Sequence, residues 1–394
     1  MILPEHCSIQ QRVNPVHSPL ILFVLMRIKK QIILIFTFLL FACPIYAQAD
    51  HSWTAFLNED TGLVGFKDQH GRIRIKPKYA GFTTAKKFDK IIAVMAEKNG
   101  KNEFYYLTKA GKIAQRGNLY LLDNSPDCES EGFIRFRDRK TDKAGLLNGE
   151  GKIAIPALYN DLTSVRNGFI SALKGAKKKS LDANGPSGCN HFTWVDGETL
   201  LIDTRNKIII RNFDSESPLD FFSINIASEP SKDVRRQNFL GVDGRYYSFV
   251  DYKKEFQEWL FSNLLENLSI DRLIEYSYHE IYFWKEPDGW IHESKHKFIE
   301  RNFELIKNRL TELNKKNSEY FISIDGLNPF IYNAAEFNEY YNNCGEPKEW
   351  KYPVMSVIIN HKTKTDLNQD HFEFLRTANG YKMISVTIRN GTLK

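Results

Sequence analysis

Short runs of alternating apolar and polar residues fill the chain from about residue 50 to residue 212, and each run stops at a polar turn. A period of two is typical of strands that bury one face. Strands are predicted to enter the turns at residues 63–67, 104–107, 144–147 and 200–202, and Ile-rich strands are predicted to leave them. The pattern therefore predicts a series of β-hairpins.

The turns recur at a fixed spacing. Gly71, Gly111 and Gly151 lie 40 residues apart, and Asn206 ends a fourth copy 55 residues further on. Asp, Asn or Thr stands three positions earlier, where its side chain can accept a hydrogen bond from the turn backbone. The final position requires a left-handed backbone, which Gly and then Asn tolerate best. Such self-similarity predicts an all-β array of hairpin repeats over residues 50–212.

Two of the copies carry the same residues at nearly the same offsets. They are Gly65, Gly71, Ile75, Pro77 and Tyr79 in the first copy and Gly145, Gly151, Ile155, Pro156 and Tyr159 in the third. Because proline cannot donate to a strand ladder, Pro77 and Pro156 are expected to end their strands. The set resembles the bacterial WG repeat over about residues 52–212, although Val64 and Ala144 replace the tryptophan that names the family.

This resemblance implies a β-repeat interaction module rather than an enzyme. Many members of the family are exported or envelope proteins, so the resemblance also agrees with an envelope address. The alternative is an ordinary β-sandwich whose turns agree by coincidence.

After about residue 245 the apolar spacing becomes that of helices. Phe256, Leu260 and Leu264 fall on one helical face, and a later helix is predicted over residues 295–315. Strands are then predicted at residues 320–324, 354–360, 371–376 and 381–389. Helices followed by antiparallel strands predict an α+β domain over residues 245–394, with a linker at 213–244 before it.

The closing hairpin of that domain, FEFLRTANGYKMISV, resembles the last strands of nuclear-transport-factor-like α+β cone domains. Such cones often hold a pocket, so the resemblance implies a ligand site in the C-terminal domain.

The N-terminus has the three-part layout of a secretory signal peptide. A basic segment begins at Met26, an apolar run covers residues 32–42, and a small-x-small pattern ends at Ala49. The apolar run is shorter than the roughly 20 residues that a membrane helix needs. We expect residues 1–49 to be removed, which leaves no stable membrane span and an address in the periplasm, the outer envelope or the medium.

Two alternatives remain at this end of the chain. Met26 is a second candidate for the true start of the protein. An uncleaved membrane anchor would use the apolar residues 19–26 in addition to the apolar run. Cys43 would carry a lipid if the preceding residues served as a lipoprotein box.

The charge distribution argues against nucleic-acid binding. The net charge is +6, of which residues 1–49 contribute +3. The remaining charges are interspersed, and the one basic block, residues 177–179, lies in a Gly-rich loop rather than on a basic face.

Cysteines are few after the leader: Cys128, Cys189 and Cys344. An oxidising compartment permits a disulfide. Cys128 and Cys189 are the expected pair because both fall in the N-terminal half.

One motif could carry chemistry. His292, Glu293 and His296 fit the pattern H-E-x-x-H, which on a helix lets both histidines bind Zn²⁺ while the glutamate activates a water. Gly289 and Trp290 indicate a turn just before it, and Lys295 places a cation between the proposed ligands. We therefore expect a solvated helix start, with no catalytic residue, metal or cofactor.

The sequence thus favours a non-enzymatic exported protein. Its repeats would bind an envelope protein or a polysaccharide, and its C-terminal domain would dock against them or hold a ligand. A zinc-dependent envelope hydrolase that uses His292, Glu293 and His296 is the alternative.

Overall fold

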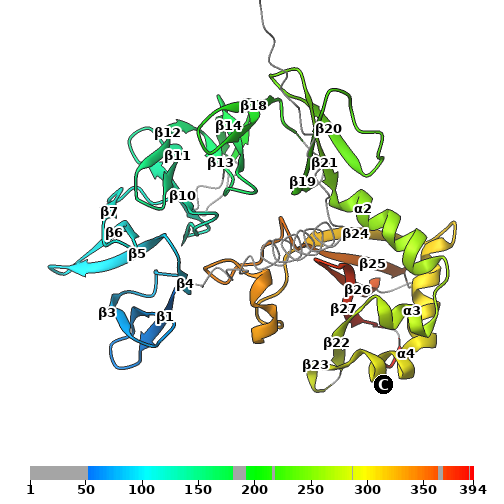
Figure 1. The fold of residues 1–394 in the computed structure, drawn as a ribbon. Coiled ribbons are helices and arrows are strands. Elements are labelled where there is room, and N and C mark those ends of the chain that lie inside the picture. The colour runs from blue at the N-terminus through cyan, green and yellow to red at the C-terminus, as the bar shows by residue number, and fades with distance from the viewer. Residues whose placement is uncertain (1–51, 181–191, 215–217, 286, 363–366, 390) are drawn as a thin grey trace, which may run out of the picture. The chain divides into compact units, whose positions relative to one another are not determined.

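The computed structural model describes residues 52–180, 192–214, 218–285, 287–362, 367–389 and 391–394 (Figure 1). The expected leader from Met26 to Ala49, Cys43 and Cys189 lie outside these residues. The described chain consists mainly of strands in antiparallel sheets, as the sequence predicts. None of its described helices is long and apolar enough to cross a membrane.

The predicted hairpins lie in three antiparallel sheets, whose strand orders are β4-β1-β2-β3-β5-β6-β7, β10-β11-β12 and β13-β14-β17-β18. The strands predicted to enter the turns are β2, β6, β11 and β17. Two ribbons, β8-β9 and β15-β16, accompany these sheets. The bounds are β1 Trp53–Asn58, β2 Leu63–Lys67, β3 Ile73–Tyr79, β4 Lys87–Phe88, β5 Ile91–Lys98, β6 Lys101–Thr108, β7 Ile113–Ala114, β8 Leu121–Leu122, β9 Ser125–Pro126, β10 Phe133–Asp138, β11 Lys143–Asn148, β12 Ile153–Tyr159, β13 Asp161–Leu162, β14 Phe169–Lys174, β15 Lys177–Ser180, β16 Phe192–Val195, β17 Glu198–Asp203 and β18 Ile208–Arg211.

The four turns share one backbone conformation. Gly71, Gly111, Gly151 and Asn206 have φ values of 75°, 82°, 69° and 66°. In each turn the N–H of this residue donates to the carbonyl three positions earlier, at 2.8–3.0 Å. In the third copy Oδ1 of Asn148 also accepts from two backbone N–H groups, both at 3.0 Å. The side chain of the first turn residue thus stabilises the turn by accepting hydrogen bonds from its backbone.

Strands β3 and β12 continue past their prolines, so the prediction that Pro77 and Pro156 end them is wrong. The register places Val64 opposite Tyr79 and Phe66 opposite Ile75, so a bulge of three residues on β3 faces one residue on β2. The register of β11 and β12 has the same irregularity. A bulge leaves ladder positions unpaired, and proline is tolerated there because no donor is needed.

Glycine is required opposite each bulge. A Cβ on Gly145 would lie 2.7 Å from the carbonyl oxygen of Ile155 and 2.6 Å from the ring of Phe136. A Cβ on Gly65 would meet Ile75 and Phe56 at 2.7 and 2.9 Å. The glycine of the repeat therefore serves the close approach of the bulged strand and of an aromatic ring on the other neighbouring strand.

Residues 213–244, expected as a linker, contribute strands to a further sheet. Its order is β19-β21-β20, with bounds β19 Leu219–Ala227, β20 Arg236–Leu240 and β21 Tyr246–Asp251. The turn before β21 repeats the earlier geometry, since the N–H of Gly244 donates to the carbonyl of Gly241 at 3.0 Å and Gly244 has a φ of 77°. In this sheet the turn comes just before the central strand β21. In a sheet such as β10-β11-β12 the turn comes just after the central strand β11.

The last sheet has six strands in the order β23-β22-β27-β26-β25-β24, and all neighbours are antiparallel except β22 and β27. Helices precede the sheet and interrupt it, and β22 and β23 are strands that the sequence pattern did not predict. The bounds are α2 Tyr252–Trp259, a π-helical turn Leu260–Leu265, α3 Ile270–Glu275, β22 Ser277–Lys285, β23 Gly289–Ser294, α4 Lys295–Leu310, a 3-10 turn Thr311–Asn314, β24 Tyr320–Asp325, a 3-10 turn Ala335–Tyr340, β25 Val354–Lys362, β26 Leu367–Thr377 and β27 Gly380–Thr387.

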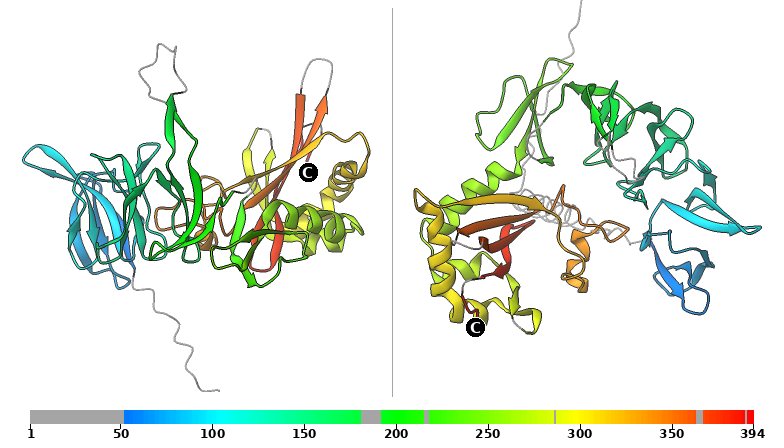
Figure 2. Two further views of the ribbon diagram at one scale, coloured as in Figure 1. Left: turned by 90° about the horizontal axis from the view of Figure 1, so that it is seen from above. Right: turned by 180° about the vertical axis from the view of Figure 1, so that it is seen from behind.

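Both faces of this sheet are covered. The helices lie on one face (Figures 1 and 2). They pack there through a core that includes Phe256, Phe298 and Phe374. Residues 326–352 cover the other face, where Tyr332 and Phe337 join a second aromatic cluster.

The segment 326–352 also reaches the repeats. The N–H groups of Lys86 and Lys87 donate to the carbonyl of Asn343 at 2.8 and 2.9 Å, and Cys344 forms a disulfide with Cys128. The expected pairing of Cys128 with Cys189 is therefore wrong, because a sulfur atom forms one disulfide. Sequence distance misleads here, since the cysteine from the far half of the chain is brought next to Cys128 by the covering segment.

We predict that Gly145→Ala destabilises the protein by about 2–4 kcal/mol, because the new methyl group must displace a strand or the Phe136 ring. Chemical unfolding measures the loss. Gly81→Ala is the control, since a Cβ there has no neighbour within 4 Å. Equal stability of the two variants would contradict the role assigned to Gly145.

We predict that Cys344→Ser lowers the free energy of unfolding by about 2–5 kcal/mol, because the long unfolded loop is no longer closed. Cys189→Ser should leave it unchanged. Denaturant titration under non-reducing conditions compares the two. The opposite ranking would favour the Cys128–Cys189 pair.

Candidate functional site

A cavity of about 550 Å³ lies between the second and third repeat copies and residues 342–350. Residues 127–130 and 161–166 form its repeat side, together with side chains of β14 and β17. The volume falls in the range of small-molecule sites. Because Cys128 is part of the lining, the disulfide fixes the two sides of the cavity to each other.

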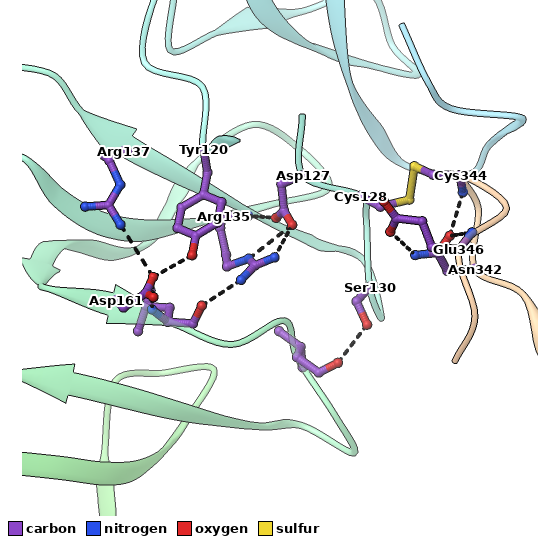
Figure 3. A network of polar contacts seen from close by, with 12 residues as sticks. Tyr120, Asp127, Cys128, Ser130, Arg135, Arg137, Asp161, Asn342, Cys344 and Glu346 are labelled. Carbon is purple, nitrogen blue, oxygen red and sulfur yellow. Dashed lines mark hydrogen bonds and ion pairs between the residues drawn. A yellow bond between two sulfur atoms is a disulfide. The ribbon is translucent and has the colours of Figure 1, made fainter. Parts of the chain in front are cut away.

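A buried ion pair forms the floor on the repeat side. Nε and Nη2 of Arg135 both donate to Oδ1 of Asp127, and Nη1 donates to the carbonyl of Leu162 at 2.7 Å (Figure 3). The backbone N–H of Arg135 donates to the other oxygen of Asp127 at 2.8 Å. The side chains are 14% and 4% exposed. A buried pair is stable only when its remaining donors find acceptors, and here each guanidinium nitrogen does. Burial by itself would lower the pKa of Arg135, but Asp127 raises it, so the guanidinium stays charged.

Tyr120 links this pair to a second carboxylate. Its hydroxyl donates to Asp161 at 2.5 Å, and Arg137 approaches the same oxygen at 3.4 Å (Figure 3). The guanidinium of Arg135 lies 4.2 Å from the centre of the Tyr120 ring. Burial raises the pKa of Tyr120 to about 12, while Arg135 opposes the rise. The phenol therefore remains a hydrogen-bond donor at neutral pH.

Glu129 lies next to the disulfide and is 6% exposed. Its Oε2 accepts from the backbone N–H groups of Lys90 and Ile91 at 2.8 and 3.1 Å. Burial raises its pKa, and the two N–H bonds only partly offset the rise. Glu129 thus ties the loop that carries Cys128 to the start of β5.

The residues of the predicted alternative zinc site lie on two different elements of the structure. His292 and Glu293 lie on β23, and His296 lies on α4, so the two histidines do not share one helix. Successive residues of a strand point to opposite faces. Glu293 pairs with Arg301 and Lys297 of α4, whereas His292 stacks on Tyr282, which belongs to the cluster on the other face. Glu293 therefore cannot act on a metal held by His292.

His292 belongs to a different hollow of about 490 Å³, which includes His279, Glu280 and Glu336. His292 bonds to Glu280, and His279 bonds to Glu336 at 3.0 Å. Among the described residues, no three His, Cys, Asp or Glu side chains are grouped closely enough to hold a metal ion.

The residues that build the cavity were not predicted from the sequence. Tyr120, Asp127 and Arg135 have no motif, and their partners lie at irregular distances along the chain. The one available signal was Cys128, whose neighbours Asp127 and Glu129 are acidic residues in a segment of short strands. That signal indicates a structured loop but not its partner.

We predict that stability depends on the protonation of Glu129. Because its folded pKa is raised, its contribution is fully present below the ordinary glutamate value of 4.5 and is lost as the pH rises through the folded pKa. Glu129→Gln keeps an acceptor without the charge, so its stability relative to the native protein should improve between about pH 4 and pH 7. Thermal melting across this range measures the difference. Glu59→Gln, on an exposed turn, is the control. Parallel profiles for Glu129→Gln and the native protein would disprove the prediction.

The comparisons with known proteins bear on the repeats. The sequence model of the family described as WG containing repeat matches residues 145–177, which confirms the resemblance for the copy that contains Gly145 and Gly151. No curated protein matches the chain. The crystal structure of TolB from Acinetobacter baumannii aligns with 51% of this chain and 55% of that chain, at 10% identity and a TM-score of 0.17, too low to support an argument. The chain is thus similar to a WG repeat over residues 145–177.

Proposed function

We propose that the chain is an exported bacterial binding protein without catalytic activity. A WG-like repeat array over residues 50–212 would be followed by an α+β domain, and the cavity near Cys128 would be the binding site. The observation that carries the proposal is that distant segments, the repeats and residues 342–350, line one cavity and are joined covalently beside it. Its partner would be an envelope protein or a polysaccharide.

The C-terminal sheet supports kinship with nuclear-transport-factor-like cone domains. Its strand order and the helices on one face are compatible with such a cone. However, Phe298, Phe372 and Phe374 are fully buried in the space between helices and sheet. The interior of this domain is therefore a packed core, which favours the cavity at the repeats as the ligand site.

The geometry favours binding over zinc-dependent hydrolysis. His292 and Glu293 point to opposite faces of a sheet and His296 lies on α4, while the carboxylates of Asp127 and Asp161 are already engaged by arginines. A carboxylate fixed in an ion pair positions a site but is poorly suited to accept a proton.

Export is supported by the disulfide, since such bonds persist in oxidising compartments. We predict that the protein recovered from the cell envelope begins within a few residues of Asp50, which Edman sequencing of the purified chain would show. Recovery of the intact leader on cytoplasmic protein would refute export.

Binding at the cavity can be tested with one blocked variant. Ser164→Trp places a large side chain in the cavity lining, and Lys316→Trp places the same side chain on an exposed turn. Immobilised envelope polysaccharide and envelope protein from the producing cells serve as probes in biolayer interferometry. We expect Ser164→Trp to weaken binding to one probe at least tenfold and Lys316→Trp to leave it unchanged. Equal binding by both variants, or no binding by the native protein, would reject the proposed site.

A further inference from the structure

Arg166 is an arginine of the cavity that lacks an ion-pair partner among the described residues. Its guanidinium carbon lies 5.1 Å from the centre of the Trp350 ring. Its Nε is buried and finds no hydrogen-bond acceptor in the described part of the chain, and the side chain lines the cavity. Burial lowers the pKa of Arg166, and the negative charge of Glu349 opposes that effect. A guanidinium removed from water without an acceptor is costly, so an anionic ligand group would stabilise it.

Arg135 lies in the same cavity, but its guanidinium has hydrogen-bond acceptors within the protein. Asp127 and the carbonyl of Leu162 satisfy its guanidinium from within the protein. Arg135 is therefore part of the framework, and Arg166 is the guanidinium available to a ligand. The planar fork of arginine fits a carboxylate with two parallel hydrogen bonds.

Glutamates of the lining require hydrogen-bond donors, whereas its serine and threonine hydroxyls can donate as well as accept. Glu346 and Glu349 both line the cavity and, when ionised, only accept. The hydroxyls of Ser164, Ser171 and Thr199 also line it, and within the described chain these hydroxyls make no side-chain hydrogen bond. The matching ligand therefore carries one anionic group together with several O–H donors.

This requirement separates the ligand classes. A phosphate or sulfate ion by itself accepts, as a carboxylate does, but it brings no ring of hydroxyls that could donate to Glu346 and Glu349. A neutral saccharide has hydroxyl oxygens that can accept from Arg166, but it leaves the positive charge of the guanidinium without a counter-charge. A uronic acid has one carboxylate on a ring of hydroxyls, and Trp350 and Tyr120 add the aromatic surface that many ligand sites use.

We propose that the cavity binds an acidic saccharide, with the carboxylate of a uronic-acid unit on Arg166 and ring hydroxyls on Glu349 and the free serine and threonine hydroxyls. This inference rests on the proposed binding function and narrows its partner to a uronate-containing polysaccharide. A peptide C-terminus, which also offers a carboxylate, is an outcome that the test separates.

The test uses tetragalacturonate and tetramannuronate, each beside its own methyl ester, in isothermal titration of the mature protein. The ester keeps every ring hydroxyl and removes the charge. We expect at least one acid form to bind at least tenfold more tightly than its ester. Equal affinity of each acid and its ester, or tighter binding of a peptide with a free C-terminus, would overturn the proposal.

The variant Arg166→Gln tests whether Arg166 causes the preference for the acid over its ester. It should reduce the preference for the acid over its ester at least tenfold, whereas Arg139→Gln, on an exposed turn outside the cavity, should retain it. Loss of affinity for acid and ester alike would show that Arg166 is not the carboxylate partner. If Arg166→Gln does not fold, the comparison of acid and ester on the native protein still decides. Envelope binding that Ser164→Trp abolishes but Arg166→Gln leaves intact would preserve the proposed function and reject the acidic ligand.

Discussion

The disulfide between Cys128 and Cys344 joins residues 216 positions apart, and the candidate site depends on that junction. Residues 342–350 form one side of the cavity, and they are held to the repeats by this bond and by the backbone bonds from Lys86 and Lys87 to Asn343. In the unfolded chain the same bond closes a long loop, which lowers the entropy gained on unfolding. One covalent link thus stabilises the fold and fixes the distance across the cavity.

The repeats depend on a different constraint, the close approach of backbone at Gly65 and Gly145. A bulge on one side and an aromatic ring on the other leave no room for a Cβ. The family tryptophan is absent here, and Val64 and Ala144 stand opposite Tyr79 and Tyr159 in the register. The two tyrosines are almost fully buried, and Tyr159 reaches Asn206 in the next turn at 2.7 Å. Large tyrosines on the neighbouring strand thus occupy the core beside the small residues.

Some charged side chains of the cavity pair with one another, and others remain available to a ligand. Asp127 and Arg135 neutralise each other at low exposure, and Tyr120 and Arg137 engage Asp161. Such internal pairs hold the lining rigid before any ligand arrives, which lowers the cost of binding. Arg166 and Glu349 are left to meet the solvent or a ligand, and this difference between satisfied and unsatisfied groups gives the site its chemical preference.

The sequence by itself determined the hairpin turns and the strands around them, because those features depend on residues within a few positions of each other. The spacing of Gly71, Gly111, Gly151 and Asn206 identified the period, and helix periodicity placed α4. Pro77 does not end its strand as predicted, since a bulge depends on the partner strand. It also could not predict β22 and β23, whose pairing is set by β27 and by the face that they cover.

The cavity was decided only by the tertiary structure. Cys128 and Cys344 carry no signal of their pairing, and nothing in the sequence tells that Asp127 and the carbonyl of Leu162 accept from Arg135. Sequence patterns report burial and turn geometry, which are short-range properties of the chain. The partner of a charge or a thiol is a long-range property, because it depends on where the segment 326–352 returns to the repeats.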